Sequence, residues 1–428
     1  MTTLTRAEAR ALDAVDRAAI AASLTELLAV PSVGGTDAEA DVQHLLAKQL
    51  QRLGTDVDLW PMDLAELCAA PGFPGAEVTR SEAWGLVGTA RGAAEEPGAA
   101  PALVLQGHVD VVPPGDLARW GTEPFEPTWR GSRVHGRGAC DMKAGVVANL
   151  AALAAVRASG VRLARGLAVH LVVGEEDGGL GAFGTLHRGH TGDACIITEP
   201  TSGTLVTAAA GALTFTLEVP GVATHASTPY AGHSAIDSYV LLHRALAELG
   251  EERNRAVEPL MAEYPVPYPL VVGRVRAGDW SSSVPDLLVA DGRLGLRIEE
   301  NPDVGRRELE ERIAAVAAAD PFLRDHPPVV TWSGGQFAGG QLFPGHPLRE
   351  LVLQAHADVA GQQRLRERGA PYGSDLRLYA EAGIPTLHYG PGDVRLAHGP
   401  DEAVDLDEVV RVTEALVLAV LRSCGTGG

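Results

Sequence analysis

The stretch Gly136-Arg137-Gly138-Ala139-Cys140-Asp141-Met142-Lys143-Ala144-Gly145 is a glycine-rich turn that contains one acidic residue. The apolar run that follows it, from Val146 to Val156, predicts a helix. An aspartate after glycines means little alone, but clusters of acidic and histidine residues lie on both sides of this one in the chain. We therefore interpret Asp141 as a carboxylate that two metal ions share.

Three of these clusters come directly after strand-like apolar runs. They are Gly107-His108-Val109-Asp110, Gly174-Glu175-Glu176-Asp177 and Thr198-Glu199-Pro200. Strands are predicted at 103–107, 167–173 and 194–198, and helices at 146–158 and 180–188. This alternation is typical of an α/β domain with a mostly parallel sheet. Ligands of such sheets bind outside the carboxyl ends of the strands, so the clusters are expected at one edge.

The pattern changes after Pro200, and 428 residues are long for one domain. Strands are predicted at 213–219, 268–275 and 287–298, with helices at 235–249 and 306–318. This order describes a small α+β unit, and the core-like pattern returns at 348–359. We predict a catalytic metal-binding domain from residues 1–207 and 329–428. An inserted lid domain is predicted from residues 208–328.

The N-terminal part carries two local signals. Apolar residues at helical spacing predict a helix within 14–30, which Pro31 ends. Thr36-x-x-Glu39 matches a capping box, in which the threonine hydroxyl and the glutamate carboxylate each accept a backbone N–H of the first turn. The helix that it opens is predicted to end at Gly54.

Composition excludes several classes of partner. The formal net charge of −20 argues against nucleic acid and anionic membranes, which bind basic surfaces. The four cysteines are scattered without a C-x-x-C pair, which indicates a reducing compartment. Residues 1–13 lack the apolar core of a signal peptide, and no apolar run is long enough to span a membrane. We expect a cytoplasmic protein.

A hydrolase with two metal ions needs carboxylates and imidazoles at one mouth and a shared ligand between the ions. His108 and Glu199 can complete one ion, and Glu176 and His398 the other, with Asp141 bridging them. His388 competes with His398, but it lies on a predicted strand, where a packed or hydrogen-bonded side chain is expected. Such ligands suit two Zn²⁺ ions per chain, and Co²⁺ or Mn²⁺ would also fit them.

A metal hydrolase also needs a base that is not a ligand, and Glu175 is the acidic residue left for that role. Asp110 lies two residues after His108 and is well placed to hold its imidazole. Glu175 and Glu176 could instead be ordinary loop acids. Their place after an apolar strand and before Gly178-Gly179 favours the functional interpretation.

The whole set resembles the M20 family of zinc-dependent peptidases and deacylases, which includes acetylornithine deacetylase, succinyl-diaminopimelate desuccinylase, aminoacylase and glutamate carboxypeptidase. The resemblance covers nearly the whole chain. It rests on five motifs in order, which are Gly107–Val112, Gly136–Gly145, Gly174–Gly179, Thr198–Pro200 and Ala397–Glu402. One departure is Lys143-Ala144-Gly145, where the family usually has Lys-Gly-Gly. The resemblance implies a catalytic domain of aminopeptidase/carboxypeptidase type, the five metal ligands named above, and Glu175 as catalytic base.

The resemblance also implies a lid that forms a homodimer. Gly221-x-x-x-His225-Ala226-Ser227 is similar to the lid motif whose histidine reaches across the dimer and stabilises the oxyanion. His233 is the rival for this role. Relatives often carry Asn-Val-Val-Pro and then a strand arginine that binds the substrate carboxylate. Here the chain has Ser282-Ser283-Val284-Pro285, with Arg293 and Arg297 as two candidates.

A last resemblance concerns Gly373-Ser374-Asp375-Leu376-Arg377, which is similar to the family's Gly-Thr-Asp-x-Arg motif on the substrate side. It makes Asp375 and Arg377 candidate substrate-binding residues, together with Ser282 and Ser283.

We expect a dinuclear zinc hydrolase that cleaves the amide bond of an N-acyl amino acid, as acetylornithine deacetylase does. A dipeptidase or carboxypeptidase would use the same metal site and differ in the lid. An aminopeptidase-like relative with other ligands is a further alternative. A binding protein that holds metal without catalysis is the remote one, and the presence of Glu175 argues against it.

Overall fold

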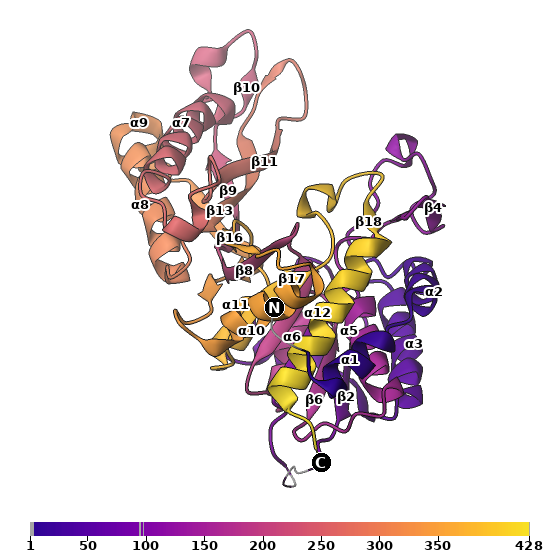
Figure 1. Cartoon of the computed structure of the whole chain (residues 1–428). Coiled ribbons are helices and arrows are strands. Elements are labelled where there is room, and N and C mark those ends of the chain that lie inside the picture. Colours follow the sequence, from indigo (N-terminus) through magenta and orange to yellow (C-terminus); the bar gives the residue numbers. More distant parts are fainter. Residues whose placement is uncertain (1–3, 94–95, 97, 428) are drawn as a thin grey trace. The chain divides into compact units, whose positions relative to one another are not determined.

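The computed structural model describes residues 4–93, 96 and 98–427 (Figure 1). Two compact units make up the chain. The first contains residues 1–207, 341–368 and 378–428, and the second contains residues 208–340 and 369–377. The domain ranges predicted from the sequence, 1–207 with 329–428 and 208–328, stay a prediction.

One large sheet runs through the first unit. Within the described residues its order is β1-β2-β6-β3-β7-β17-β8-β15, with β16 paired to β8. The strands are β1 (Asp56–Pro61), β2 (Trp84–Ala90), β3 (Leu103–His108), β6 (Leu167–Val172), β7 (Cys195–Pro200), β8 (Thr204–Ala209), β15 (Gly340–Gln341), β16 (Arg366–Ala370) and β17 (Thr386–Gly390).

The centre of this sheet is parallel. Strand β3 pairs in parallel with β6 and β7, and β7 pairs in parallel with β17. Strands β1 and β2 add antiparallel pairs on one side, and β8 pairs antiparallel with β17 on the other. Every residue of β3, β6 and β7 is buried, as expected for parallel strands covered on both faces. The predicted α/β fold class is confirmed, with a mixed sheet whose centre is parallel.

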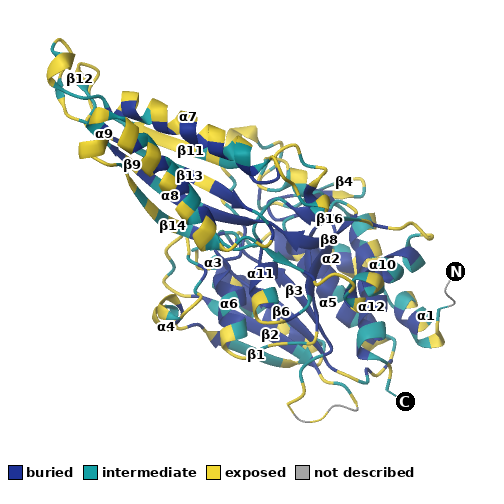
Figure 2. Ribbon diagram, turned by 90° about the vertical axis from the view of Figure 1, so that its left-hand side faces the viewer, coloured by how far each residue is buried: buried dark blue, intermediate teal, exposed yellow. Residues whose placement is uncertain are grey.

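Helices pack around this sheet. They are α1 (Arg6–Asp13), α2 (Arg17–Leu28), α3 (Ala38–Arg52), α4 (Leu64–Ala69), α5 (Lys143–Ala158), α6 (Leu180–His187), α10 (Pro347–Val359), α11 (Leu376–Glu381) and α12 (Leu406–Cys424). Helix α5 is buried along most of its length, contacts β3 and β7, and packs against α12 and α2 (Figure 2). Among the described residues no helix combines the length and the apolar character that crossing a membrane requires.

Helix α5 begins directly after the turn that carries Asp141. Its first residue, Lys143, is fully buried, and its ammonium donates hydrogen bonds to the carbonyl groups of Leu27 and Val30 at 3.1 and 2.7 Å. Leu27 lies in the last turn of α2 and Val30 directly after it, and both carbonyls also accept backbone N–H groups. The lysine therefore ties the Asp141 turn to the end of a neighbouring helix.

The start of α3 differs from the sequence expectation. The hydroxyl of Thr36 donates to the carbonyl of Val33 at 2.7 Å, and the N-cap residue Asp37 makes no side-chain cap. The Glu39 carboxylate accepts the backbone N–H of Gly35 but is also bound by Arg80. The predicted capping box is therefore wrong, because both side chains have partners outside the first turn of the helix.

The second unit contains a four-stranded antiparallel sheet in the order β11-β13-β9-β14 within the described residues. Its strands are β9 (Gly211–Pro220), β11 (Leu270–Ala277), β13 (Leu287–Leu296) and β14 (Val329–Phe337), and a small ribbon joins β10 (Thr224–His225) to β12 (Ser283–Val284). Helices α7 (Ala235–Arg253), α8 (Pro302–Ala319) and α9 (Pro321–Asp325) complete the unit. Leucine and alanine side chains of α7 and α8 pack with those of β9 and β13 in its core.

A three-stranded sheet lies beside the Asp141 turn in the chain. It consists of β4 (Thr128–Arg130), β5 (Arg133–His135) and β18 (Ala403–Asp405), in the order β18-β5-β4. Because β18 pairs with β5, the segment after His398 is held next to the segment that leads into the turn.

Candidate metal centre

The predicted ligands lie at the carboxyl ends of the central strands. His108 is the last residue of β3, and Glu199 is the penultimate residue of β7. Glu175 and Glu176 lie in the turn after β6, and Asp141 lies in the turn before α5. Because β6, β3 and β7 are parallel neighbours, these ends meet at one edge of the sheet.

Asp141 lies between two imidazoles. Its Oδ1 is 3.2 Å from Nε2 of His108, and its Oδ2 is 3.4 Å from Nε2 of His398. Nε2 of His108 also lies 3.7 Å from Oε1 of Glu199, and Nε2 of His398 lies 2.9 Å from Oε2 of Glu176. One carboxylate thus faces two separate sets of donors, which is the arrangement expected of a bridging ligand.

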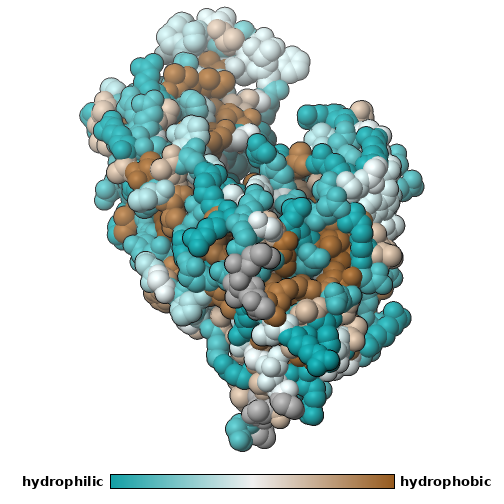
Figure 3. Space-filling model, viewed as in Figure 1, coloured by the Kyte–Doolittle hydropathy of each residue, from teal (hydrophilic) through white to brown (hydrophobic). Residues whose placement is uncertain are grey.

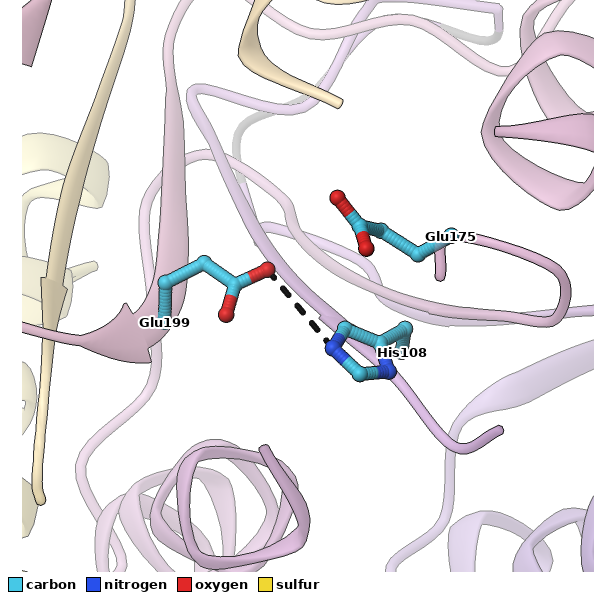
Figure 4. Close-up of side chains that lie close together, drawn as sticks. All are labelled: His108, Glu175 and Glu199. Atoms are coloured by element: carbon cyan, nitrogen blue, oxygen red, sulfur yellow. Dashed lines mark ion pairs between the residues drawn. The ribbon is translucent and has the colours of Figure 1, made fainter. Parts of the chain in front are cut away.

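Glu175 joins the same cluster. Possible ligand atoms converge here in two sets that share His108. One set is His108, Glu175 and Glu199, and the other is His108, Asp141 and Glu176. Within each set these atoms lie within 4.8 Å of one another. Figure 4 shows the side chains of the first set pointing toward one another. Glu175 therefore lies close to His108, as the predicted ligands do, and its position is compatible with the role of a base and with that of a ligand.

Asp110 contacts the cluster in a way that the sequence did not indicate. Nδ1 of His108 lies 3.0 Å from the backbone carbonyl of Asp110, whereas the Asp110 carboxylate is 3.6 Å away, which is too far for a hydrogen bond. With the proton on Nδ1, the lone pair of Nε2 faces the cluster, as a metal ligand requires. The carboxylate of Asp110 instead accepts the backbone N–H groups of Glu175 and Glu176 at 3.3 and 3.2 Å.

The donor set fits divalent cations. Four carboxylates and two imidazoles converge, and burial together with Asp141 raises the pKa of Glu176 to about 7. Burial alone would lower the pKa of His108, yet Glu199 and Asp141 hold it well above its usual value. Both pKa shifts have the same cause, which is an excess of buried negative charge that favours bound protons. A dication bound by imidazole and carboxylate groups would neutralise this charge instead.

The two imidazoles have different surroundings. The His108 side chain is fully buried, whereas 54% of the His398 side chain is exposed. His398 follows a short 3₁₀ helix (Val394–Leu396) and has a φ of +62°, a conformation that few residues other than glycine adopt. The first imidazole therefore belongs to the core of the sheet, and the second to a surface loop.

A buried ion pair that the sequence analysis missed holds this loop and the Asp141 turn together. The Glu402 carboxylate accepts the backbone N–H groups of Gly138, Cys140 and Asp141 at 3.1, 2.9 and 3.0 Å. Arg137 binds the same carboxylate at 2.6 Å and donates to the backbone carbonyl of His398 at 3.2 Å. Both side chains are almost fully buried. Each lies inside a quoted motif, but nothing in the sequence shows that they pair.

His225 and its neighbours come together in the second unit. His225 pairs with Ser283 across the β10–β12 ribbon, and the backbone N–H of Ala226 donates to the carbonyl of Ser282. Nδ1 of His225 accepts the backbone N–H of Ser227 at 3.1 Å, which leaves the proton on Nε2. The exposed imidazole can therefore act as a hydrogen-bond donor through Nε2.

The two arginine candidates differ in their surroundings. Arg293 lies within β13 and is exposed, opposite Val271 of β11. Arg297 lies just after β13, is partly buried, and donates to the backbone carbonyl of Arg253 at 3.1 Å. Arg297 thus takes part in packing within the second unit, whereas Arg293 projects from a strand.

The remaining candidates are buried. Asp375 is fully buried, and Arg377 donates to the carbonyl of Ser374 at 2.7 Å while its guanidinium lies over the ring of Phe337. The rivals lie elsewhere: His388 is buried in β17, and His233 stacks on Phe322.

Comparison with known proteins gives related enzymes over most of the chain. The chain is 29% identical to the N-formyl-4-amino-5-aminomethyl-2-methylpyrimidine deformylase of Halalkalibacterium halodurans, over 90% of this chain and 89% of the other. It is 30% identical to the succinyl-diaminopimelate desuccinylase of Xanthomonas euvesicatoria pv. vesicatoria, over 75% of this chain and 82% of the other.

Solved structures share the fold. A tripeptidase from Staphylococcus aureus superposes with a TM-score of 0.72, covering 96% of this chain and 99% of the other at 18% sequence identity. The model of peptidase family M20/M25/M40 matches residues 104–422, which include every residue of the candidate metal centre. The chain therefore belongs to peptidase family M20/M25/M40 and is a metal-dependent hydrolase of amide bonds.

Proposed function

We propose that this protein removes an acyl group from the nitrogen of an amino acid with the help of two zinc ions. The observation that carries the proposal is the position of Asp141, whose two carboxylate oxygens face His108 and His398 separately. His108, Asp141 and Glu199 would hold one ion, and His398, Asp141 and Glu176 the other. Two ions held there would lower the pKa of water and polarise the amide carbonyl.

Glu175 is the base in this proposal. Each ion would have three protein ligands without it, which would leave a coordination position open, as catalytic sites require. Its carboxylate lies within 4.8 Å of ligand atoms of His108 and Glu199, so it reaches the same opening. Glu175 takes a proton from water and returns it to the leaving amine.

Other residues hold or assist these groups. The backbone carbonyl of Asp110 orients His108, and the Asp110 carboxylate holds the backbone on which Glu175 sits. The Nε2 proton of His225 is proposed to stabilise negative charge on the carbonyl oxygen. Arg293 is proposed to bind the carboxylate of the substrate, because it is exposed and its planar fork matches that group.

The related enzymes support a deacylase over a peptidase. The deformylase and the desuccinylase, which share 29% and 30% identity with the chain, are both named for removing a small acyl group. The tripeptidase, at 18% identity, supports only the fold. A second candidate follows from the deformylase: removal of a formyl group from an aminomethylpyrimidine, a substrate without an α-carboxylate.

Amine release from a substrate panel tests the proposal. The panel holds N-acetyl, N-formyl and N-succinyl amino acids, their α-amides, N-formyl aminomethylpyrimidine and dipeptides, each with and without a chelator. We expect chelator-sensitive release from N-acyl amino acids and little from their α-amides. Arg293→Met should raise KM for the acids and leave the α-amides unchanged, whereas Arg297→Met serves as the control.

Other results would redirect the proposal. Release from the formyl pyrimidine alone would favour the second candidate, and release from dipeptides alone would make the protein a peptidase. A metal-loaded protein that hydrolyses no member of the panel would contradict the deacylase.

We also propose a homodimer formed through the second unit. Strand β11 is an edge of its sheet, and edge strands readily pair with a second copy. Ile236 and Val240 of α7 and Val271 and Val275 of β11 are exposed apolar residues, and Figure 3 shows hydrophobic atoms over these elements. Sedimentation should give a dimer for the wild type and a monomer for Val240→Asp. A monomeric wild type would exclude the dimer.

A cytoplasmic location completes the proposal. All four cysteines are free of disulfides, and three of them are buried. Free thiols fit a reducing compartment. Cell fractionation with an antibody to the protein tests the location.

A further inference from the structure

The turn between β6 and α6 carries both Glu175 and Glu176, so its position matters for the reaction proposed above. Asp110 holds one side of this turn through two backbone N–H groups. The turn also needs glycine, since Gly174 and Gly179 have φ values of +67° and +94°. Backbone hydrogen bonds join Gly178 to Glu175 and Gly179 to Gly174 within the turn, and a side chain attaches its other side to a neighbouring segment.

Asp177 supplies that side chain. Its Oδ2 accepts the backbone N–H groups of Glu77 and Val78 at 3.2 and 3.1 Å. Both of its oxygens also accept hydrogen bonds of 2.8 Å from the guanidinium of Arg80. The residue next to Glu176 is therefore tied to the segment that precedes β2.

Arg80 binds a second carboxylate with the same guanidinium. Its Nε donates to Oε2 of Glu39 at 2.9 Å, and its Nη2 donates to Oε1 at 3.1 Å. Glu39 lies in the first turn of α3. The side chains of Arg80 and Glu39 are 3% and 4% exposed, and that of Asp177 is 9% exposed, so water replaces none of these contacts readily.

Only arginine can make this connection. Four hydrogen bonds in two forks require the planar set of donors, whereas lysine offers one ammonium at the end of a flexible chain. The guanidinium also packs on the turn itself, because a Cβ added to Gly174 would lie 3.1 Å from Nη2 of Arg80. Arg80 therefore lies next to Gly174, the residue directly before Glu175.

Arg80 supplies the positive charge beside two buried carboxylates, those of Glu39 and Asp177. Burial and the nearby Asp110 raise the pKa of Glu39 to about 7, against the opposing effect of Arg80. Without the guanidinium, the carboxylates of Glu39 and Asp177 would stay buried without the cation that they share. Loss of one partner from a buried ion pair is costly, since the other charges stay buried without compensation.

We propose that Arg80 is a positioning residue for the metal centre. It holds the turn in place through its contacts with Asp177 and Glu39. Glu176 would then reach the ion that it shares with His398, and Glu175 would face the reacting water. This inference rests on the proposed function. It assigns a role to three residues, Arg80, Glu39 and Asp177, that are not among the metal ligands or substrate-binding residues proposed above.

The test compares Arg80→Lys and Arg80→Met with the same changes at Arg188. Arg188 also makes a two-pronged contact with an aspartate, Asp58, at 2.8 and 3.1 Å, but its side chain is 44% exposed and it does not contact the turn. Calorimetric titration of the metal-free proteins with zinc measures the two binding steps. Steady-state rates then give kcat and KM for the best substrate of the panel.

We expect the Arg80 variants to bind the ion of Glu176 and His398 about 10- to 100-fold more weakly, the range typical of groups that orient metal ligands. The ion of His108 and Glu199 should keep its affinity. We expect kcat to fall by a similar factor with little change in KM, and Arg80→Lys to retain more than Arg80→Met. The Arg188 variants should match the wild type.

Arg80 variants with wild-type affinities for both ions and an unchanged kcat would overturn the inference, as would equal weakening of both ions. If an Arg80 variant does not fold, Asp177→Asn replaces it, because the amide keeps the shape and removes the charge that binds Arg80. A wild type that hydrolyses nothing contradicts the proposed function only, since the two zinc affinities still decide the role of Arg80.

Discussion

The two halves of the metal centre are built differently. The His108 half lies on strands β3 and β7, where the side chains of His108 and Glu199 are 0% and 7% exposed. The His398 half lies on loops, where His398 is 54% exposed and its partner Glu176 sits in a turn. Strands in a buried sheet hold their side chains by packing, whereas the loops depend on ion pairs such as Arg137–Glu402 and Arg80–Asp177.

In the proposed metal centre, this difference would give two sites with similar ligands unequal affinities for their ions. A preformed, buried site needs little reordering when an ion binds, but an exposed loop loses freedom. The His108 half should therefore bind its ion more tightly than the His398 half. Asp141 lies near the histidines of both halves and, in the proposed function, would couple them.

Removal of the shared ligand should break both halves at once. Asp141→Ala is expected to lose both ions and all measurable activity, because each half loses one of its three ligands. Metal content after dialysis and amine release check this result. Asp13→Ala, an exposed aspartate at the end of α1, is the control. An Asp141→Ala protein that keeps two ions would show that Asp141 does not bridge.

A pair of neighbouring substitutions separates catalysis from metal binding. Glu175→Gln should retain two ions and lose about 10²- to 10⁴-fold in kcat, since the amide cannot accept the proton of water. Glu176→Gln should lose the ion of the His398 half, because Glu176 lies 2.9 Å from His398. Metal content and kcat are measured for both. The base would be misassigned if Glu175→Gln stayed fully active.

Chelator titration measures the inequality of the halves directly. The wild type should release one ion at a lower chelator concentration than the other. His398→Ala should keep one tightly bound ion, whereas His108→Ala should lose the tight ion and bind the other about 10- to 100-fold more weakly. Equal release of both ions from the wild type would show that burial does not decide affinity here.

Acid titration of the metal-free protein compares His108 with buried histidines that have no carboxylate partner in the metal centre. His170 and His388 are as buried as His108, but burial lowers the pKa of each to about 3, whereas carboxylates raise the pKa of His108. An imidazole that stays neutral in the folded state stabilises it above about pH 6.5, and this contribution is lost as the pH falls toward 3.

We therefore expect the free energy of unfolding to fall between about pH 6.5 and 3, by a few kcal/mol for each of the two histidines. His170→Gln should flatten this decline, measured by denaturant titration at several pH values with a chelator present. His187→Gln, at an exposed histidine, is the control. A decline of unchanged slope in His170→Gln would contradict the role of burial.

Much of the fold follows from local pattern. The apolar runs at 103–107 and 167–173 became β3 and β6, and the acids after them lie at the predicted edge. The N-terminal part was less predictable. Helix α1 begins at a capping box of Thr5 and Glu8 that the sequence analysis did not identify, whereas the capping box predicted at Thr36 and Glu39 is wrong.

The sequence by itself determined the kinds of ligand and their order, because strand periodicity and the residues after each strand are local properties of the chain. Only the tertiary structure decided the partners. Arg80 joins Glu39 and Asp177, which lie 41 and 97 residues away, and Glu402 holds a turn more than 260 residues before it. Such pairs leave no periodic signal, since they depend on which loops the packed sheet brings together.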